Sequence, residues 1–109
     1  MRSEGVFVSV WHRVASVSEI GPNETKRVRV GDELIALYNC DGDFYATDDT
    51  CSHAEASLSE GWLEDCEITC PLHGAIFDVT TGKPLCLPAT KPIRTYPVRV
   101  EGDDIFIEV

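Results

Sequence analysis

Hydrophobic and polar residues alternate in several short segments of the chain, with the period of two that is typical of β-strands. The clearest early examples are Val6 to Val14 and Lys26 to Val30. A more continuous apolar run extends from Glu33 to Tyr38, and the Asp41-Gly42 pair after it predicts a hairpin turn into Phe44 to Ala46. The first half of the chain is therefore expected to form antiparallel strands.

Residues 47–90 have a different character, because short strand-like pieces alternate there with turns and prolines. The pieces are Gly61 to Leu63, Cys66 to Thr69 and Ala75 to Val79. Beyond this region the alternation returns in Arg94 to Glu101 and Ile105 to Val109, around a turn at Gly102-Asp103-Asp104. The pattern predicts a loop-rich lobe that is followed by a closing hairpin.

No stretch of a dozen residues carries a helical stripe, and the sequence holds no internal repeat or linker. A short helical turn around Ser16 to Ile20 or Glu55 to Ser59 would be compatible with an all-β domain. At 109 residues the chain has the size of one domain. The prediction is a single all-β domain over residues 1–109, with the loop-rich lobe at about 47–90.

Acidic residues outnumber basic ones by 19 to 9, which gives a formal net charge of −10. Such a field repels phosphate backbones and anionic lipid heads, so nucleic acid is not expected as a partner. No apolar stretch approaches the roughly 20 residues of a membrane span, and the N-terminus lacks the pattern of a signal peptide. These features predict a cytoplasmic protein that binds no membrane.

Two matching sets of metal-binding side chains lie in the loop-rich region. The first is Cys51-Ser52-His53, and the second, after 16 intervening residues, is Cys70-Pro71-Leu72-His73-Gly74. Thiolate and imidazole ligands suit zinc or an iron-sulfur cluster, whereas calcium and magnesium prefer oxygen. A zinc site with two Cys and two His usually takes the Cys pair from a hairpin and the His pair from a helix. Two loops that each give one Cys and one His can instead hold a two-iron cluster, with both cysteines on one iron and both histidines on the other.

On these residues the sequence resembles the Rieske family, and in particular the Rieske ferredoxins of bacterial aromatic-ring dioxygenase systems. The resemblance covers nearly the whole chain and extends to Phe44-Tyr45-Ala46, Ser57 to Gly61, Phe77-Asp78, Thr81-Gly82 and the closing stretch from Leu87 to Ile93. It implies an antiparallel β sandwich or barrel as a base, with a cluster-binding lobe inserted into it. It also implies one 2Fe-2S cluster of the Rieske type, held by Cys51, His53, Cys70 and His73.

The same resemblance implies a function in electron transfer rather than in catalysis. A Rieske ferredoxin accepts one electron at a time from a flavin-containing, NAD(P)H-dependent reductase and passes it to the terminal oxygenase of an aromatic-ring dioxygenase. Such a carrier is expected to be a cytoplasmic monomer. The chain has only three histidines, so His12 alone would remain for the separate mononuclear iron of an oxygenase, which is too few. The aromatic substrate and the class of reductase cannot be inferred from the sequence.

Two alternatives remain open at this point. The small Rieske-like subunit of an assimilatory nitrite reductase has a similar size, and a zinc-stabilised interaction module is the other reading of the four ligands. Rieske proteins of cytochrome complexes are less similar, because they carry a membrane anchor and an extra Cys in each ligand loop, where this chain has Ala56 and Leu72. They also carry hydroxyl groups where this chain has Ala75 and Phe77, so we expect a potential near the low end of the Rieske range, about −150 to +300 mV.

Other conspicuous residues have plainer interpretations. Cys40, Cys66 and Cys86 are predicted to be ordinary thiols, with Cys66 the nearest of the three to a predicted ligand. His12 is expected on a strand at the surface or at a sheet edge.

Trp11, Trp62 and Phe77 are predicted to pack in the core, as large aromatics in a small β domain usually do. The stretch between the two ligand motifs is acidic through Glu55, Glu60, Glu64, Asp65 and Glu67. We expect these acidic residues to form a solvated face, and docking of a partner is the second interpretation.

Overall fold

The structure is a computed structural model that describes residues 10–51, 56–72, 74–87 and 91–109. The described part is mostly β-strand, which confirms the all-β prediction. Its elements in chain order are β1 (Trp11–Ser16), the 3-10 turn η1 (Val17–Glu19), β2 (Thr25–Val30), β3 (Glu33–Cys40), β4 (Asp43–Asp48), the 3-10 turn η2 (Leu58–Glu60), β5 (Trp62–Glu64), β6 (Glu67–Thr69), β7 (Ile76–Asp78), β8 (Thr95–Tyr96), β9 (Val98–Glu101) and β10 (Asp104–Glu108).

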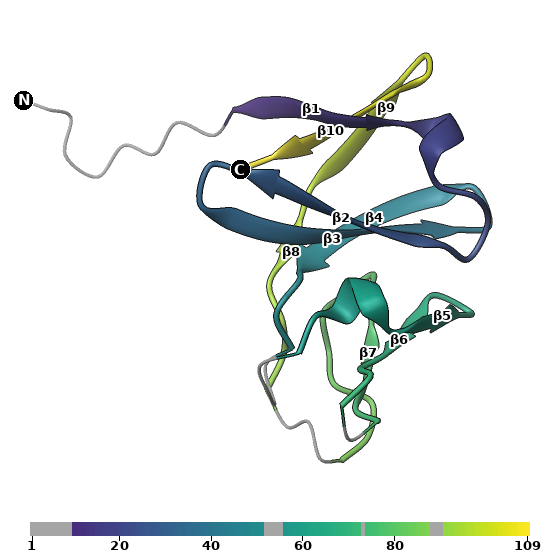
Figure 1. Cartoon of the computed structure of the whole chain (residues 1–109), viewed down its shortest axis with the longest axis vertical. Helices are drawn as coiled ribbons and strands as arrows, with labels where there is room; N and C mark the ends of the chain where they lie inside the picture. Colours follow the sequence, from purple (N-terminus) through teal and green to yellow (C-terminus); the bar gives the residue numbers. More distant parts are fainter. Residues whose placement is uncertain (1–9, 52–55, 73, 88–90) are drawn as a thin grey trace, which may run out of the picture.

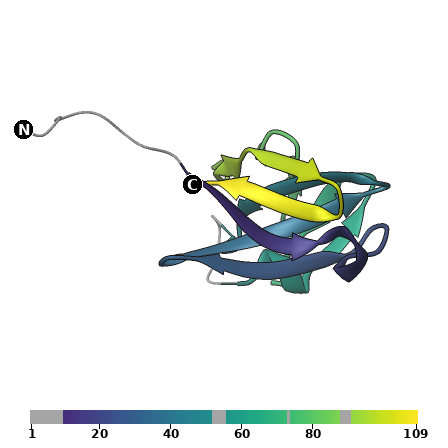
Figure 2. The same cartoon turned by 90° about the horizontal axis from the view of Figure 1, so that it is seen from above.

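The strands form three antiparallel sheets, and two of these make a base. One base sheet has the order β1-β10-β9 and the other has the order β2-β3-β4-β8. Seen from above, the first sheet lies across the second (Figure 2). The third sheet, β5-β6-β7, lies on the far side of the four-stranded sheet (Figure 1). We call residues 49–94, which connect β4 to β8, the lobe, and the rest of the described chain the base.

Strand β3 separates two hydrophobic cores, because its side chains are buried on both faces. Ile35 and Leu37 belong to the core of the base, whereas Ala36, Tyr38 and Cys40 belong to the core of the lobe. Alternate residues of a strand point to opposite sides of the sheet, so a strand between two cores has a continuous apolar sequence. This explains the unbroken apolar run in the sequence of β3.

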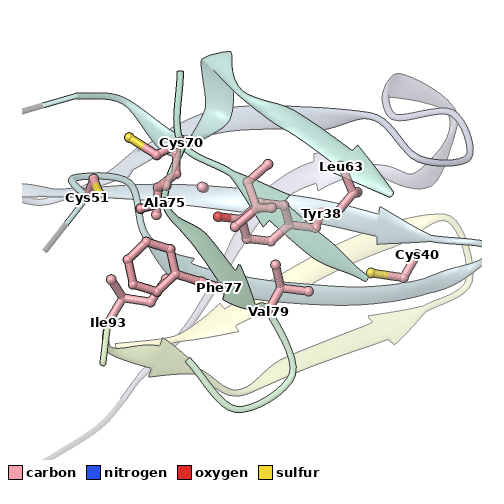
Figure 3. Packing of buried hydrophobic residues seen from close by; sticks show 12 residues of the cluster. Tyr38, Cys40, Cys51, Leu63, Cys70, Ala75, Phe77, Val79 and Ile93 are labelled. Atoms are coloured by element: carbon pink, nitrogen blue, oxygen red, sulfur yellow. The ribbon is translucent and has the colours of Figure 1, made fainter. Parts of the chain in front are cut away.

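Each core draws on several elements. The core of the base consists of Ala15, Ile20, Val28, Val30, Ile35, Leu37, Ala46, Tyr96, Ile105 and Ile107. The core of the lobe, shown in Figure 3, consists of Ala36, Tyr38, Cys40, Cys51, Leu58, Leu63, Ile68, Cys70, Ala75, Phe77, Val79 and Ile93. Both predicted ligand cysteines are members of the second core.

Pro97 divides a segment that the sequence predicts as one strand, Arg94 to Glu101. The structure has β8 before Pro97 and β9 after it, and the two strands belong to different base sheets. Proline has no amide N–H and a fixed φ, so it interrupts a hydrogen-bonded ladder and suits a change of sheet. The strand expected from Val6 also begins later, at Trp11, and residues 6–9 lie outside the described part of the chain.

The predicted turns are in place. Asp41 and Gly42 join β3 to β4 with φ of 56° and 101°, the left-handed conformation that two-residue hairpin turns require. Two short helical turns also form where the sequence allows them, η1 within Ser16 to Ile20 and η2 overlapping Glu55 to Ser59. Local turn chemistry was therefore a sound guide in this chain.

The prediction for the aromatics is wrong for Trp62. Its side chain is 64% exposed, because Leu63 takes the inward position of β5 and alternation sends Trp62 to the outer face. Phe77 is fully buried, as predicted. Trp11 is only half-buried, and the guanidinium of Arg99 lies over its ring at 4.4 Å.

Cys40 and Cys66 are not the free thiols that the sequence predicts, because they form a disulfide with a Cα–Cα distance of 5.3 Å. Cys40 ends β3, and Cys66 lies in the turn between β5 and β6 with φ of 61°. The bond joins the base to the lobe across 26 residues of sequence. The pairing depends on how the lobe folds back onto β3, and the spacing of the cysteines does not show it. Cys86 is free, as predicted.

None of the helical segments in the described residues is long and apolar enough to cross a membrane.

Candidate metal centre

The first ligand loop begins just after β4, where the backbone folds back on itself. The amide of Cys51 donates to the carbonyl of Ala56 at 2.9 Å, and Thr50 forms an isolated β-bridge with Ser57. These contacts close a short hairpin whose first residue is Cys51. His53 lies within this loop by sequence and is outside the described residues.

The second ligand loop connects β6 to β7 in the same way. The amide of Cys70 donates to the carbonyl of Ala75 at 2.7 Å, again five residues further along the chain. Gly74 has φ of 72°, a conformation that glycine adopts without strain, which allows the loop to return to β7. The two loops therefore match in their hydrogen bonding as well as in sequence. His73 lies outside the described residues.

The two predicted ligand cysteines meet at one end of the lobe core. Cys51 is 3% exposed and Cys70 is fully buried. Figure 3 shows both sulfurs beside Ala75, whereas Cys40 lies at the opposite end of the same core. Burial raises the pKa of the Cys70 thiol, the hydrogen bond from the Leu72 amide acts against this, and the neighbouring Cys51 thiol raises the pKa further.

The amide of Leu72 donates to Sγ of Cys70 at 3.5 Å, so one main-chain donor already points at a ligand sulfur. Within the described ranges, no group of three or more His, Cys, Asp or Glu side chains is placed to hold a metal ion. The structure thus brings together the two sulfur ligands of the predicted set, and the two histidines stay a prediction.

Comparison with known protein families decides what kind of lobe this is. The Rieske 2Fe-2S domain matches residues 10–97, which includes both ligand loops and most of the base. The chain belongs to the Rieske family. It is therefore a protein with one Rieske-type 2Fe-2S cluster, and the reading of the four ligands as a zinc site is set aside.

Among individual proteins, the chain is similar to the 3-phenylpropionate/cinnamic acid dioxygenase ferredoxin subunit of Escherichia coli K12. The two are 53% identical over 94 residues, which covers 85% of this chain and 88% of the relative. The ferredoxin of carbazole 1,9a-dioxygenase from Nocardioides aromaticivorans has a similar structure, with a TM-score of 0.86, 36% identity and coverage of 89% of this chain and 95% of that one.

A chain in a solved complex of reduced oxygenase and oxidised ferredoxin, in carbazole 1,9a-dioxygenase, matches with a TM-score of 0.85. It is 42% identical, and the match covers 89% of this chain and 91% of that chain. A nitrite reductase small subunit from Mycobacterium tuberculosis reaches a TM-score of 0.83 at 20% identity, over 94% of this chain and 97% of that one. At this identity the second likeness shows the shared fold alone.

The residues present fit a Rieske cluster. A thiolate buried without a positive partner is unfavourable, as the raised pKa of Cys70 indicates, and bound iron supplies the positive charge that stabilises it. The two sulfurs come from matched hairpins and lie side by side, which suits a pair of ligands to one iron. A donor set of sulfur and imidazole also excludes the hard cations that prefer oxygen.

One histidine and one free cysteine remain outside the predicted ligand set. His12 is half-buried on β1, the edge strand of its base sheet, as predicted. Cys86 is exposed, and its Sγ lies 3.8 Å from the carbonyl oxygen of Gly74, beside the second ligand loop. Neither residue is needed to complete the predicted set.

The structure describes the four positions at which the sequence is expected to differ from Rieske proteins of cytochrome complexes. Ala75 and Phe77 are fully buried in the lobe core and offer no hydroxyl. Ala56 packs half-buried against the same core, and Leu72 is 43% exposed. A disulfide between the two ligand loops is therefore absent at Ala56 and Leu72, and the disulfide of this chain instead joins β3 of the base to the turn between β5 and β6 of the lobe.

Sequence reasoning missed Asp49, a buried carboxylate that comes two residues before Cys51 and is only 2% exposed. Its Oδ1 accepts the amide of Ser59 at 2.9 Å, and its Oδ2 accepts the hydroxyl of Ser57 at 2.6 Å. A carboxylate two residues before a ligand motif was the available signal. Its burial could not be recognised, because an aspartate in a loop is usually solvated.

Proposed function

We propose that this Rieske protein is the one-electron carrier of an aromatic-ring dioxygenase system. It accepts electrons from a flavin-containing, NAD(P)H-dependent reductase and delivers them to the terminal oxygenase. The observation that carries this proposal is the likeness to a dioxygenase ferredoxin subunit over most of both chains. A ferredoxin subunit carries electrons and is not the catalytic oxygenase, so the chain itself is not an enzyme.

In this proposal Cys51 and Cys70 bind one iron through their sulfurs, and His53 and His73 bind the other through ring nitrogens. The bound cluster supplies a centre that takes up and gives back a single electron. The lobe core excludes water from the sulfur side, because Cys51, Cys70 and Phe77 are all buried there. Transfer is therefore expected on the histidine side of the site.

The surface of the lobe suits brief contact with partners. Four of the large hydrophobic residues with exposed side chains lie in the lobe, namely Trp62, Leu72, Leu85 and Leu87. Between Cys51 and Cys70 the sequence has five acidic residues and no lysine or arginine. Apolar side chains near acidic ones favour a partner surface that is apolar with a basic border. An electron shuttle also needs weak, fast complexes, which are compatible with a monomer.

We further propose that residues 1–109 act as one domain in the cytoplasm, since the reductase of such a carrier takes its electrons from a cytoplasmic nicotinamide cofactor. The alternative as a nitrite reductase small subunit has less support, because its likeness extends to the fold alone. The aromatic substrate would be selected by the oxygenase, and this chain has no part in that choice.

The test has two stages. Electron paramagnetic resonance of the dithionite-reduced protein should give a Rieske signal, and a colourless, silent protein would contradict the cluster. The carrier function is then measured by reconstitution: with its reductase, its oxygenase and NADH, product should form only when this chain is present. Electron delivery to a nitrite reductase large subunit, with none to an oxygenase, would replace the proposed function by the alternative.

A further inference from the structure

The buried carboxylate of Asp49 is held in place by its backbone as well as by its side chain. Its amide donates to the carbonyl of Leu34 in β3 at 3.0 Å, and its carbonyl accepts the amide of Leu58 in η2 at 2.7 Å. The two serine donors to the carboxylate come from the same turn region. Asp49 therefore fixes the return path of the first ligand loop against the base, and its charge has a defined position two residues before Cys51 in the sequence.

A basic side chain, that of Arg27, is paired with this carboxylate. Its Nη1 lies 3.9 Å from Oδ2 of Asp49, and the arginine side chain is 52% exposed while that of Asp49 is 3% exposed. The pair is thus asymmetric, because the negative charge is buried and the positive charge is largely solvated. Water screens the arginine more than the aspartate, so a net negative potential remains inside the lobe.

Tyr38 belongs to the same buried core as Cys51. Its side chain is fully buried, and its hydroxyl forms a hydrogen bond with Thr47 Oγ1 at 2.8 Å. Burial raises the pKa of Tyr38, the bond with Thr47 acts against this, and the charges of Asp49 and Cys51 raise the pKa further. The charges of Asp49 and Cys51 therefore both act on the buried hydroxyl of Tyr38.

Reduction adds one negative charge to a site of this kind. A fixed negative charge in a poorly polarisable interior opposes that addition more strongly than an exposed charge does. We propose that Asp49, besides positioning the first ligand loop, is the buried charge that holds the reduction potential of this protein low, and that Arg27 partly offsets it. The proposal rests on the proposed function in one respect, that a cluster is bound at Cys51 and Cys70.

The direct test is Asp49→Asn, which keeps the shape of the side chain and removes its charge. We expect the equilibrium constant for reduction to rise about tenfold, a shift of about 59 mV for a one-electron couple, measured by protein-film voltammetry. Asp48→Asn is the matched control. It removes the same charge one residue earlier, where the carboxylate instead accepts the hydroxyl of Tyr96 at 2.5 Å, and it should shift the potential much less.

A second pair of variants tests for a change of the reduction potential in the opposite direction, and neither variant alters a buried side chain. Arg27→Gln removes the offsetting charge and should lower the equilibrium constant for reduction two- to threefold. Arg29→Gln is its control, because Arg29 is exposed two residues further along β2, and none of the described ion pairs includes it. Mere structural damage would not lower the potential for Arg27→Gln and raise it for Asp49→Asn.

The outcomes separate cleanly. Equal potentials for Asp49→Asn and Asp48→Asn, with intact paramagnetic resonance spectra, would overturn the proposal. If Asp49→Asn fails to fold, the arginine pair decides, and equal potentials for Arg27→Gln and Arg29→Gln overturn it. Failure of the proposed function would look different, since the unmodified protein would then lack the Rieske signal or would not supply electrons to the oxygenase.

Discussion

The base and the lobe are built from the same kind of antiparallel strand, yet they are held together in different ways. In the base, β2 pairs with β3 over six residues, and β3 pairs with β4 over another six. In the lobe, β5, β6 and β7 have three residues each, and their ladders have three pairs each. Ladders as short as those of the lobe are not stable by themselves.

Three further features hold the lobe together despite its short ladders. The Cys40–Cys66 disulfide joins the lobe to β3. The carboxylate of Asp49 accepts a hydrogen bond from the amide of Ser59, beyond the first ligand loop. The two predicted ligand cysteines lie in the same core. The base is stabilised by burial along regular strands, so many residues contribute a little each. The lobe has its own hydrophobic core, and we expect it to depend in addition on these few residues. Removing such residues should therefore affect the lobe and leave the base intact.

The largest effect is expected from loss of a cluster ligand. Cys51→Ala, His53→Ala, Cys70→Ala and His73→Ala should each abolish the visible absorption, because an iron with a missing ligand is not retained. The far-ultraviolet circular dichroism of the base strands should remain. Cys86→Ala is the control and should keep the colour, since this exposed thiol is not a predicted ligand. A coloured Cys51→Ala protein would disprove the ligand set.

Removal of the disulfide should have the next largest effect. Cys40→Ser combined with Cys66→Ser should lower the free energy of unfolding by about 3 kcal/mol, the usual effect of a bond that closes a loop of this length. Urea unfolding followed by visible absorption should show the loss, with Cys86→Ser as the control. If bleaching and loss of circular dichroism shift together, base and lobe unfold as one unit, and the comparison between them would need revision.

The same contrast explains what could be predicted from the sequence. The base was largely predictable, because alternation along β2 and β10 and the turn at Asp41-Gly42 are local signals. Even in the base, the change of sheet at Pro97 was not predicted, because residues 94–101 alternate as one continuous strand would. The Rieske cluster of the lobe was also predictable, because metal chemistry demands particular residue types at a particular spacing, and its four ligands stay a prediction.

The rest of the lobe could not be predicted, because its features depend on tertiary contacts. Cys40 and Cys66 pair only when the turn after β5 reaches the end of β3. Trp62 is exposed because a three-residue strand has one inward position, and Leu63 occupies it. Asp49 is buried because η2 folds over it and supplies the donors. Each of these outcomes depends on how neighbouring segments pack against one another, and the pattern of a single sequence does not show that packing.

A smaller effect is expected from the charge on the lobe. Glu60→Lys combined with Glu64→Lys should slow electron transfer to the oxygenase by about tenfold at low salt, because acidic side chains guide a basic partner. Both residues are exposed. Asp32→Lys combined with Asp43→Lys makes the same change of charge at exposed sites of the base and should slow transfer less. Rates that do not depend on salt in the unmodified protein would exclude steering.

The smallest effect is expected where a hydroxyl is added beside the cluster site. Ala75 is fully buried, and its carbonyl accepts the amide of Cys70, so Ala75→Ser adds a donor directly next to the second ligand loop. A donor aimed at a cluster or ligand sulfur stabilises the reduced state more than the oxidised one, because reduction increases the negative charge on sulfur. The potential should rise by tens of millivolts, since about 59 mV corresponds to roughly 1.4 kcal/mol, the size of one good hydrogen bond.

The base offers a matched control for this last prediction. Ala46→Ser places the same hydroxyl in the core of the base, where Ala46 is 1% exposed, and should lower stability without changing the potential. Phe77→Tyr should raise the potential as Ala75→Ser does, and further in combination, but at a greater cost in stability because Phe77 is fully buried. If Ala75→Ser binds an intact cluster, places its hydroxyl within reach of sulfur and leaves the potential unchanged, hydrogen-bond donors do not set it. The buried charge of Asp49 would then be the stronger explanation, because it acts without a donor.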